Sequence, residues 1–266
     1  MKAFFTTLLA IVCMGVLLWG NIHWTQKTTV TAKKNESPVV TETEKNKEVK
    51  KEDTEAPSNS LVEFTKNWPI QGVEGFQKSL EDKRPYKILM IGSKALGEEQ
   101  SGWAALTKEK LLETYDEKYM NVDIQVFDET SRDFVNNDGA ETIIDGQADM
   151  VLFEPFTLMD NGEVSIEDSL NNIQTVMDET LEANPETVFI LMPPHPIYNA
   201  TFYPKQVEAL KGYAEDNKIA YLDHWEAWPD FKTEEVKEYI TSDNSQPNEQ
   251  GHELWSKFMT GYLISK

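Results

Sequence analysis

Short apolar runs alternate with amphipathic stretches along most of the chain, and this alternation is the feature that most limits its possible folds. The run Tyr86–Ile91 is broken only by Lys87 and is stopped by Gly92. The later runs of the same kind are Asp123–Phe127, Met150–Phe153, Thr187–Met192 and Ile219–Leu222. Such nearly continuous apolar strands are typical of parallel sheets that are buried on both faces.

Helical patterns separate these strands. A helix is predicted from Trp103 to Tyr119, another after Ser165, which can act as its N-cap, and a third from Pro204. A last helix is predicted over about residues 250–263. Strands that alternate with helices predict an α/β domain with a mostly parallel five-stranded sheet covered on both sides.

The N-terminal residues differ in composition from the rest. An apolar run from Ala3 to Trp19 follows Lys2, and its length lies between that of a signal-peptide core and that of a spanning helix. No pair of small residues suited to cleavage follows the run, and Trp19 and Trp24 suit a membrane–water interface. We therefore expect residues 1–25 to be an uncleaved membrane anchor, with a cleaved signal segment as the alternative.

Residues 26–60 are rich in Lys, Glu, Thr, Ser and Pro and are predicted to be a disordered polar linker. Residues 61–266 then form one domain of ordinary size. The chain has 25 Lys and Arg against 46 Asp and Glu, a net charge of −21, and all of the acidic excess lies in this domain. Nucleic acid would repel so acidic a domain. We expect a single-pass protein of the cell membrane with the domain outside, or a secreted protein if the signal is cleaved.

Ligands of open parallel sheets bind beyond the carboxyl ends of the strands. This rule selects the loops that begin at Gly92, Asp128, Glu154, Pro193 and Asp223. In the first of these loops, a glycine and a hydroxyl residue form a strand-to-helix turn, Gly92-Ser93. Such a turn can present the hydroxyl to a substrate while backbone N–H groups face a developing oxyanion.

This turn and a segment near the C-terminus carry a family resemblance. The order of elements, the Gly92-Ser93 turn and the Asp-x-x-x-Pro-Asn-x-x-Gly segment from Asp243 to Gly251 resemble the SGNH (GDSL-type) hydrolases over about residues 86–263. The resemblance implies a flavodoxin-like three-layer α/β/α fold and cleavage of lipid, sugar or acyl-carrier esters, or acetyl transfer. It also implies a Gly-Asp-Ser nucleophile turn, an oxyanion hole with a glycine after strand two and an asparagine after strand three, and an Asp-x-x-His base segment.

Both ends of the implied catalytic apparatus depart from this pattern. Aligned without a gap, Lys94 takes the position of the nucleophile and Ser93 that of the aspartate. In the last segment Asp243 matches, but Gln246 stands where the histidine is expected. The Gln amide takes up no proton at any accessible pH and cannot act as a general base.

The oxyanion positions depart as well. The loop after the second strand, which contains Ser131, has no glycine. After the third strand, Met159-Asp160 stands where Asn-Asp is expected, and Asn161 lies one residue further on. The predicted oxyanion or pocket residues are Gly92, Lys94, Ser131, Asp160, Asn161 and Gln246.

Two interpretations of this site follow. In the first, the site is rebuilt with Ser93 as nucleophile, His195 as base and Asp243 orienting the histidine. His224 is the alternative base, and Asp160 is the alternative orienting residue. The expected activity is then that of an esterase or acetylesterase on polysaccharide or lipid esters of the cell envelope or its surroundings, or of an O-acetyltransferase. In the second, the domain is inactive and binds a glycan or an envelope protein.

Two further expectations concern ligands. Four aromatic residues near the strand ends, with a neighbouring asparagine, could form a rim that stacks on a sugar ring. The aromatic residues are Phe202, Tyr203, Trp225 and Trp228, and the asparagine is Asn199. No pair of histidines at i and i+4 and no calcium-loop spacing occurs, so neither a metal nor a cofactor is predicted.

Overall fold

The computed structural model describes residues 57–265. The predicted anchor, residues 1–25, and nearly all of the predicted linker lie outside the described residues. Helix α2 spans Pro57–Val62, so the last residues assigned to the linker belong to a helix. Between Pro57 and Ser265, no helix is both long and apolar enough to cross a membrane.

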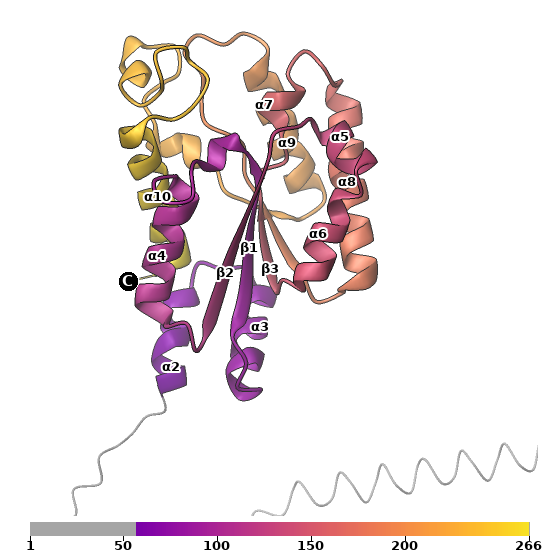
Figure 1. Ribbon diagram of the computed structural model, residues 1–266, viewed down its shortest axis with the longest axis vertical. Coiled ribbons are helices and arrows are strands. Elements are labelled where there is room, and N and C mark those ends of the chain that lie inside the picture. The colour runs from indigo at the N-terminus through magenta and orange to yellow at the C-terminus, as the bar shows by residue number, and fades with distance from the viewer. Residues whose placement is uncertain (1–56, 266) are drawn as a thin grey trace, which may run out of the picture. The chain divides into compact units, whose positions relative to one another are not determined.

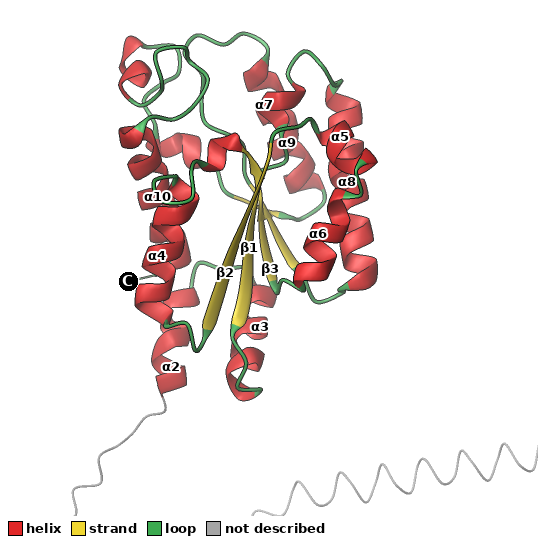
Figure 2. Ribbon diagram, viewed as in Figure 1, coloured by secondary structure: helices red, strands yellow, loops and turns green. Residues whose placement is uncertain are grey.

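A five-stranded sheet forms the middle layer, and every strand pairing in it is parallel (Figure 1, Figure 2). The spatial order is β2-β1-β3-β4-β5. The strands are β1 (Tyr86–Ser93), β2 (Met120–Phe127), β3 (Met150–Phe153), β4 (Val188–Leu191) and β5 (Ala220–Tyr221). The predicted α/β architecture is therefore confirmed.

The central strands are apolar because helices cover them on both faces. In β1, Ile88 and Met90 face one core while Leu89 and Ile91 face the other, as the two-residue period of a strand requires. All four side chains are at most 4% exposed. A polar residue at any of these positions would lose its hydration on either face, which explains the unbroken run in the sequence.

Two helical layers enclose the sheet. One core includes residues of α3, α4 and α10, and the other includes residues of α5, α6, α8 and α9 (Figure 2). The helices of the first layer are α3 (Ile70–Glu81), α4 (Trp103–Tyr115) and α10 (Glu249–Leu263). Those of the second layer are α5 (Ser131–Asn136), α6 (Gly139–Gly146), α8 (Ile166–Ala183) and α9 (Tyr203–Asp216), with the short α7 (Thr157–Asp160) near the strand ends.

Helix α4 ends earlier than predicted. The prediction extended it to Tyr119, but it ends at Tyr115 because Asp116 has a left-handed φ of 69°. Residues beyond this turn begin β2 at Met120, three residues before the predicted start. An acidic residue with positive φ gives a weaker stop signal than glycine does, so the periodic pattern alone placed the boundary too late.

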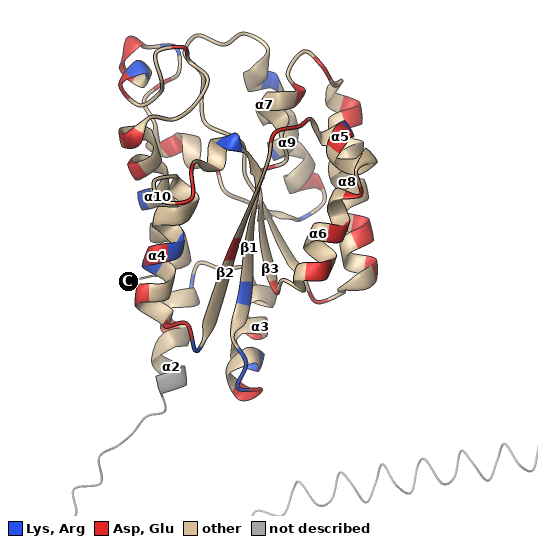
Figure 3. Cartoon of the chain, viewed as in Figure 1, with Lys and Arg blue, Asp and Glu red and all other residues tan. Residues whose placement is uncertain are grey.

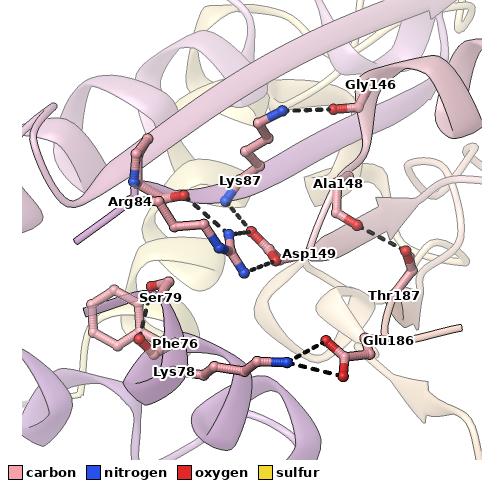
Figure 4. A network of polar contacts seen from close by, with 11 residues as sticks. Phe76, Lys78, Ser79, Arg84, Lys87, Gly146, Ala148, Asp149, Glu186 and Thr187 are labelled. Carbon is pink, nitrogen blue, oxygen red and sulfur yellow. Dashed lines mark hydrogen bonds and ion pairs between the residues drawn. The ribbon is translucent and has the colours of Figure 1, made fainter. Parts of the chain in front are cut away.

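An ion pair holds the strand ends on the amino side of the sheet. Arg84 donates two hydrogen bonds to Asp149, of 2.7 and 2.8 Å, and the backbone N–H of Lys87 donates to the same carboxylate at 2.8 Å (Figure 4). This bidentate contact ties the start of β1 to the residue before β3. The polar residues of the candidate site lie at the opposite, carboxyl edge.

Candidate ligand-binding site

Ser93 is the last residue of β1, and its hydroxyl is directed inward. Both the N–H and the hydroxyl of Ser93 donate to Oε2 of Glu154, at 2.7 and 2.5 Å. The hydroxyl oxygen also accepts from the N–H of Ala95 at 3.2 Å, which caps the short 3-10 helix η2 (Lys94–Leu96). The Ser93 residue is 3% exposed. The Ser93 hydroxyl is thus held by the carboxyl group of Glu154 rather than by a histidine.

Glu154 is the site residue that the sequence analysis missed. It follows β3, is 1% exposed, and accepts a third hydrogen bond from the N–H of Phe156 at 3.1 Å. Burial raises the pKa of Glu154 to about 8, although the three hydrogen bonds favour the charged form. Gly92 permits this arrangement, because a Cβ at Gly92 would lie 2.6 Å from Cβ of Glu154.

Lys94 occupies the position that the family resemblance assigns to the nucleophile. Its side chain is 57% exposed and its ammonium group pairs with Asp128, which follows β2, at 2.5 Å. Lys94 lines a cavity of about 720 Å³ at the carboxyl edge of the sheet. The lining of this cavity combines apolar surface with polar groups, and its residues include Lys94, Ser101, Val126, Thr241, Gln246 and His252.

The segment before α10 closes this cavity. The Thr241 N–H donates to the Gln246 carbonyl at 2.8 Å, and the Gln246 N–H donates to Thr241 Oγ1 at 3.2 Å, so the backbone of the loop is fixed. The Gln246 side-chain amide makes no hydrogen bond with any other described residue. A half-buried amide that lines a cavity on a fixed backbone is available to a ligand.

Asp243 is exposed and does not line this cavity. Its carboxylate accepts from Thr241 Oγ1 at 2.5 Å and from Ser245 Oγ at 2.8 Å. These bonds hold the pKa of Asp243 below its usual value. The carboxylate therefore stabilises its own turn, and within the described chain it orients no histidine.

The three histidines of the domain differ in their partners. His195 is fully buried and neither ring nitrogen has a hydrogen-bond partner among residues 57–265. His224 is also buried, but its Nε2 donates to the Pro193 carbonyl at 2.7 Å and its Nδ1 accepts from Trp228 at 3.0 Å. Burial lowers the pKa of each to about 3, so both rings are neutral at physiological pH.

His252, in the first turns of α10, also takes part in the site, although the sequence analysis did not propose it. Its Nδ1 accepts from the N–H of Trp103 at 3.2 Å, which leaves the proton on Nε2. Burial lowers the pKa of His252 to about 4. The turn at Gly97 lies so close that a Cβ there would meet the imidazole at 2.7 Å. His252 therefore offers a neutral N–H donor to the cavity that Lys94 and Gln246 also line.

Of the six predicted oxyanion or pocket residues, Lys94 and Gln246 line this cavity, whereas Gly92, Ser131, Asp160 and Asn161 do not. Asp160 is fully buried and accepts from the N–H of Ser131 at 2.8 Å and from Ser169 Oγ at 2.5 Å. Ser131 Oγ accepts from Asn172, and Asn161 is an exposed residue at the end of α7. The structure thus brings Asp160 and Ser131 together, where they join α5 to α7 and α8, and places Gly92 beside Glu154.

The aromatic residues form no continuous sugar-stacking rim. Tyr203 is 1% and Trp228 is 6% exposed, so both belong to the core, while Phe202 is 70% exposed. None of them lines the cavity beside Lys94. No group of three or more His, Cys, Asp or Glu side chains in the described part of the chain is arranged to hold a metal ion.

Comparisons with known proteins identify the fold of this domain. No protein-family model and no curated protein matches the sequence. A GDSL-like lipase from Parabacteroides merdae superposes with a TM-score of 0.57 at 13% identity, over 68% of this chain and 96% of that one. A lipolytic protein of the G-D-S-L family from Desulfitobacterium hafniense gives 0.54 at 18% identity, over 66% and 98%.

An acetylxylan esterase from Geobacillus stearothermophilus also superposes, with a TM-score of 0.54 at 18% identity, over 68% of this chain and 96% of that one. These neighbours have in common the ester-hydrolase fold with a parallel sheet and helices on both sides. The described domain therefore has the SGNH/GDSL-hydrolase fold that its sequence resembles.

Proposed function

We propose that this domain is a ligand-binding form of the SGNH-hydrolase fold, which holds a neutral carbohydrate in the cavity between Lys94 and Gln246 and does not cleave it. The observation that carries the proposal is the hydrogen bond, of 2.5 Å, from the Ser93 hydroxyl to Glu154. A serine with its hydroxyl held inward, without a histidine partner, lacks the geometry of an activated nucleophile.

The other two positions of the motif support the same conclusion. The ammonium group of Lys94 is engaged by Asp128, and the amide of Gln246 cannot accept the proton that acyl transfer requires. The same groups are suitable for binding. Gln246 offers both a donor and an acceptor, and His252 offers a donor.

The lining favours a neutral glycan over the other ligands considered. An acyl chain would leave the hydroxyl, amide and charged groups of this lining without partners, whereas a sugar offers hydroxyl groups to them and apolar ring faces to the rest of the lining. A polyanionic glycan would be repelled by a chain with a net charge of −21. The structural neighbour that acts on acetylated xylan is named for a carbohydrate ester, which suggests an acetylated oligosaccharide as the first probe.

Calorimetry of the full chain with acetylated xylo-oligosaccharides tests this proposal, with acetate release followed in the same samples by NMR. Binding without release of acetate is expected. Gln246→Ala should weaken binding about tenfold, the effect of one or two lost hydrogen bonds. Gln250→Ala, an exposed amide in the same segment that does not line the cavity, is the matched control. Equal affinities for the two variants would contradict the proposal.

Ester hydrolysis is the second candidate, because the Ser93–Glu154 contact places a carboxylate with a raised pKa on a serine hydroxyl. In that case Glu154 would accept the serine proton, and both Ser93→Ala and Glu154→Gln would abolish acetate release. Acetyl transfer needs the same first step and would be lost in the same variants. Release that persists in both variants would exclude Ser93 as the nucleophile.

We propose in addition that the N-terminal apolar segment tethers the domain to the outer face of a cell membrane. The support comes from the sequence alone, namely the run Ala3–Trp19 and the flanking Trp24. Membrane fractionation and digestion of intact cells by an external protease test this location. Recovery of the chain in the cytoplasmic fraction would contradict it.

A further inference from the structure

Strand β2 is an edge strand, and its outer edge is unpaired. It pairs only with β1 among the described residues, over the full register from Tyr86↔Met120 to Ser93↔Phe127. The other edge strand of the sheet, β5, has two residues, whereas β2 has eight. An edge strand of this length presents a row of free N–H and C=O groups to any additional strand.

A groove runs along this edge. It has a volume of about 960 Å³, and four consecutive residues of β2, 123–126, line it. Successive side chains of a strand point to opposite faces, so a groove lined by four in a row lies along the backbone edge itself. Helix α4 forms the other wall through Ala104, Ala105 and Leu112, and it lies beside β2 in Figure 1. Two alanines on this wall leave room for a backbone.

The groove is acidic. Glu98, Glu99, Glu109 and Asp123 line it and form no ion pair with any other described residue, and Lys108 is the one basic residue in the lining. Figure 3 shows acidic residues on β2 and on the loop that leads into α4. The Val126 side chain, 43% exposed, adds an apolar contact at the edge. Bringing carboxylates together without counter-charges is unfavourable, and a cationic occupant would relieve it.

We propose that this groove binds an extended basic peptide segment of another protein, which adds to β2 as a sixth strand. The free backbone edge would supply the main-chain hydrogen bonds of strand addition. Basic side chains on one face of the added strand would meet the carboxylates, and small apolar ones on the other would contact Val126 and the alanines of α4. A glycan could use the charges, but its hydroxyl groups do not repeat at the spacing of the N–H and C=O groups of a strand. The groove shares Gly97, Glu98 and Val126 with the cavity beside Lys94, but the inference does not require that cavity to bind a carbohydrate.

Binding of a labelled peptide that alternates lysine with valine, measured by fluorescence anisotropy on the full chain, tests the proposal. A peptide of the same sequence with every backbone nitrogen methylated keeps the charge and loses the N–H donors. A glucosamine oligomer carries positive charge without a peptide backbone. We expect the first probe to bind at least about tenfold more tightly than either of the others.

Charge-reversal variants locate the site. Glu109→Lys and Asp123→Lys change exposed residues of the groove, and each should weaken binding of the peptide by about tenfold at low salt. Glu182→Lys, an exposed acid at the end of α8 in the second helical layer, is the matched control and should have little effect. Hydrogen exchange gives a readout of strand addition, because bound peptide should protect amides within 121–127.

Several results would overturn the proposal. Equal binding of the methylated peptide would mean attraction by charge alone, and tighter binding of the glucosamine oligomer would assign the groove to a cationic glycan. Unchanged exchange in 121–127 with peptide bound would place the peptide elsewhere. Absence of binding by the first probe would mean that these carboxylates only prevent association of the edge. None of these outcomes bears on the Gln246→Ala test of the carbohydrate site.

Discussion

The imidazole of His224 lies flat on the indole of Trp255, with ring centroids 3.9 Å apart and 12° between the planes. Together with its bonds to the Pro193 carbonyl and to Trp228, this stacking makes His224 a structural link between the strand-end loops and α10. His195, in the loop after β4, is equally buried but has no such bonds. The two histidines that the sequence offered as bases therefore have different energetic roles.

Replacement of each histidine by leucine should separate these roles. His224→Leu leaves a buried carbonyl and a buried indole N–H without partners and should lower the free energy of unfolding by about 2–4 kcal/mol at pH 7. His195→Leu removes an unpartnered imidazole and should change it by less than about 1 kcal/mol. Urea denaturation at pH 7 measures both. A larger loss for His195→Leu would show that water or another group satisfies its ring.

Acid should destabilise the domain through the same two residues. Both have a pKa near 3 in the folded chain, against an ordinary value of 6.5. Because the folded-state pKa of each histidine is lowered, its contribution to the free energy of unfolding is complete above pH 6.5 and is lost as pH falls toward 3. The slope contributed by each is at most about 1.4 kcal/mol per pH unit. His195→Leu should reduce the loss of stability between pH 6.5 and pH 4, measured by urea denaturation, relative to the parent; an unchanged slope would contradict the assignment.

Glu154 should act in the opposite direction. The pKa of Glu154 in the folded chain, about 8, lies above the ordinary value of 4.5. Its contribution to the free energy of unfolding is therefore complete below pH 4.5 and is lost as pH rises through 8. The fall amounts to at most about 5 kcal/mol. Glu154→Gln, which stays neutral, should abolish this fall in urea denaturation between pH 6 and pH 9. Glu167→Gln, an exposed acid at the start of α8, is the control and should leave the profile of the parent intact.

Two glycines with the same backbone angle provide a test of the cavity wall. Gly97 and Gly162 both have φ of +90°, but a Cβ at Gly97 would lie 2.2 Å from Gly102 Cα, whereas nothing lies within 4 Å at Gly162. Gly162→Ala should cost about 1 kcal/mol from conformation alone. Gly97→Ala should cost clearly more and should displace His252, with loss of carbohydrate binding. Equal costs, measured by thermal unfolding, would mean that the turn adapts without strain.

The sequence predicted the sheet well because each parallel strand needs a continuous apolar run, and Tyr86–Ile91 and Met150–Phe153 have no other good explanation. Helices α5 and α6 were not predicted, since segments as short as six and eight residues carry little periodicity. Alignment with a known motif was enough to place Lys94 and Gln246, which both line the cavity.

The partners of the site residues were not predictable in the same way. Nothing in the order of residues says that Glu154 would turn inward onto Ser93, because that contact depends on the close approach of two strand ends at Gly92. The position of His252 likewise depends on the turn at Gly97, far away in the sequence. Tertiary juxtaposition decides such pairs, and local pattern does not record it.

The family resemblance leads to a last prediction, a gain of activity. If the cavity keeps the shape of an ester-hydrolase site, Lys94→Ser with Gln246→His should restore a serine and a base at the two positions that the motif requires. General-base catalysis typically contributes 10²- to 10⁴-fold, but Asp243 is already bound by Thr241 and Ser245 and would orient the new imidazole poorly. We therefore expect a gain of about tenfold in p-nitrophenyl acetate hydrolysis. Lys94→Ser with Gln246→Asn, which cannot take up the proton, is the control. If both double variants stay at the parent rate, the cavity has diverged from an ester-hydrolase site in shape as well as in its residues.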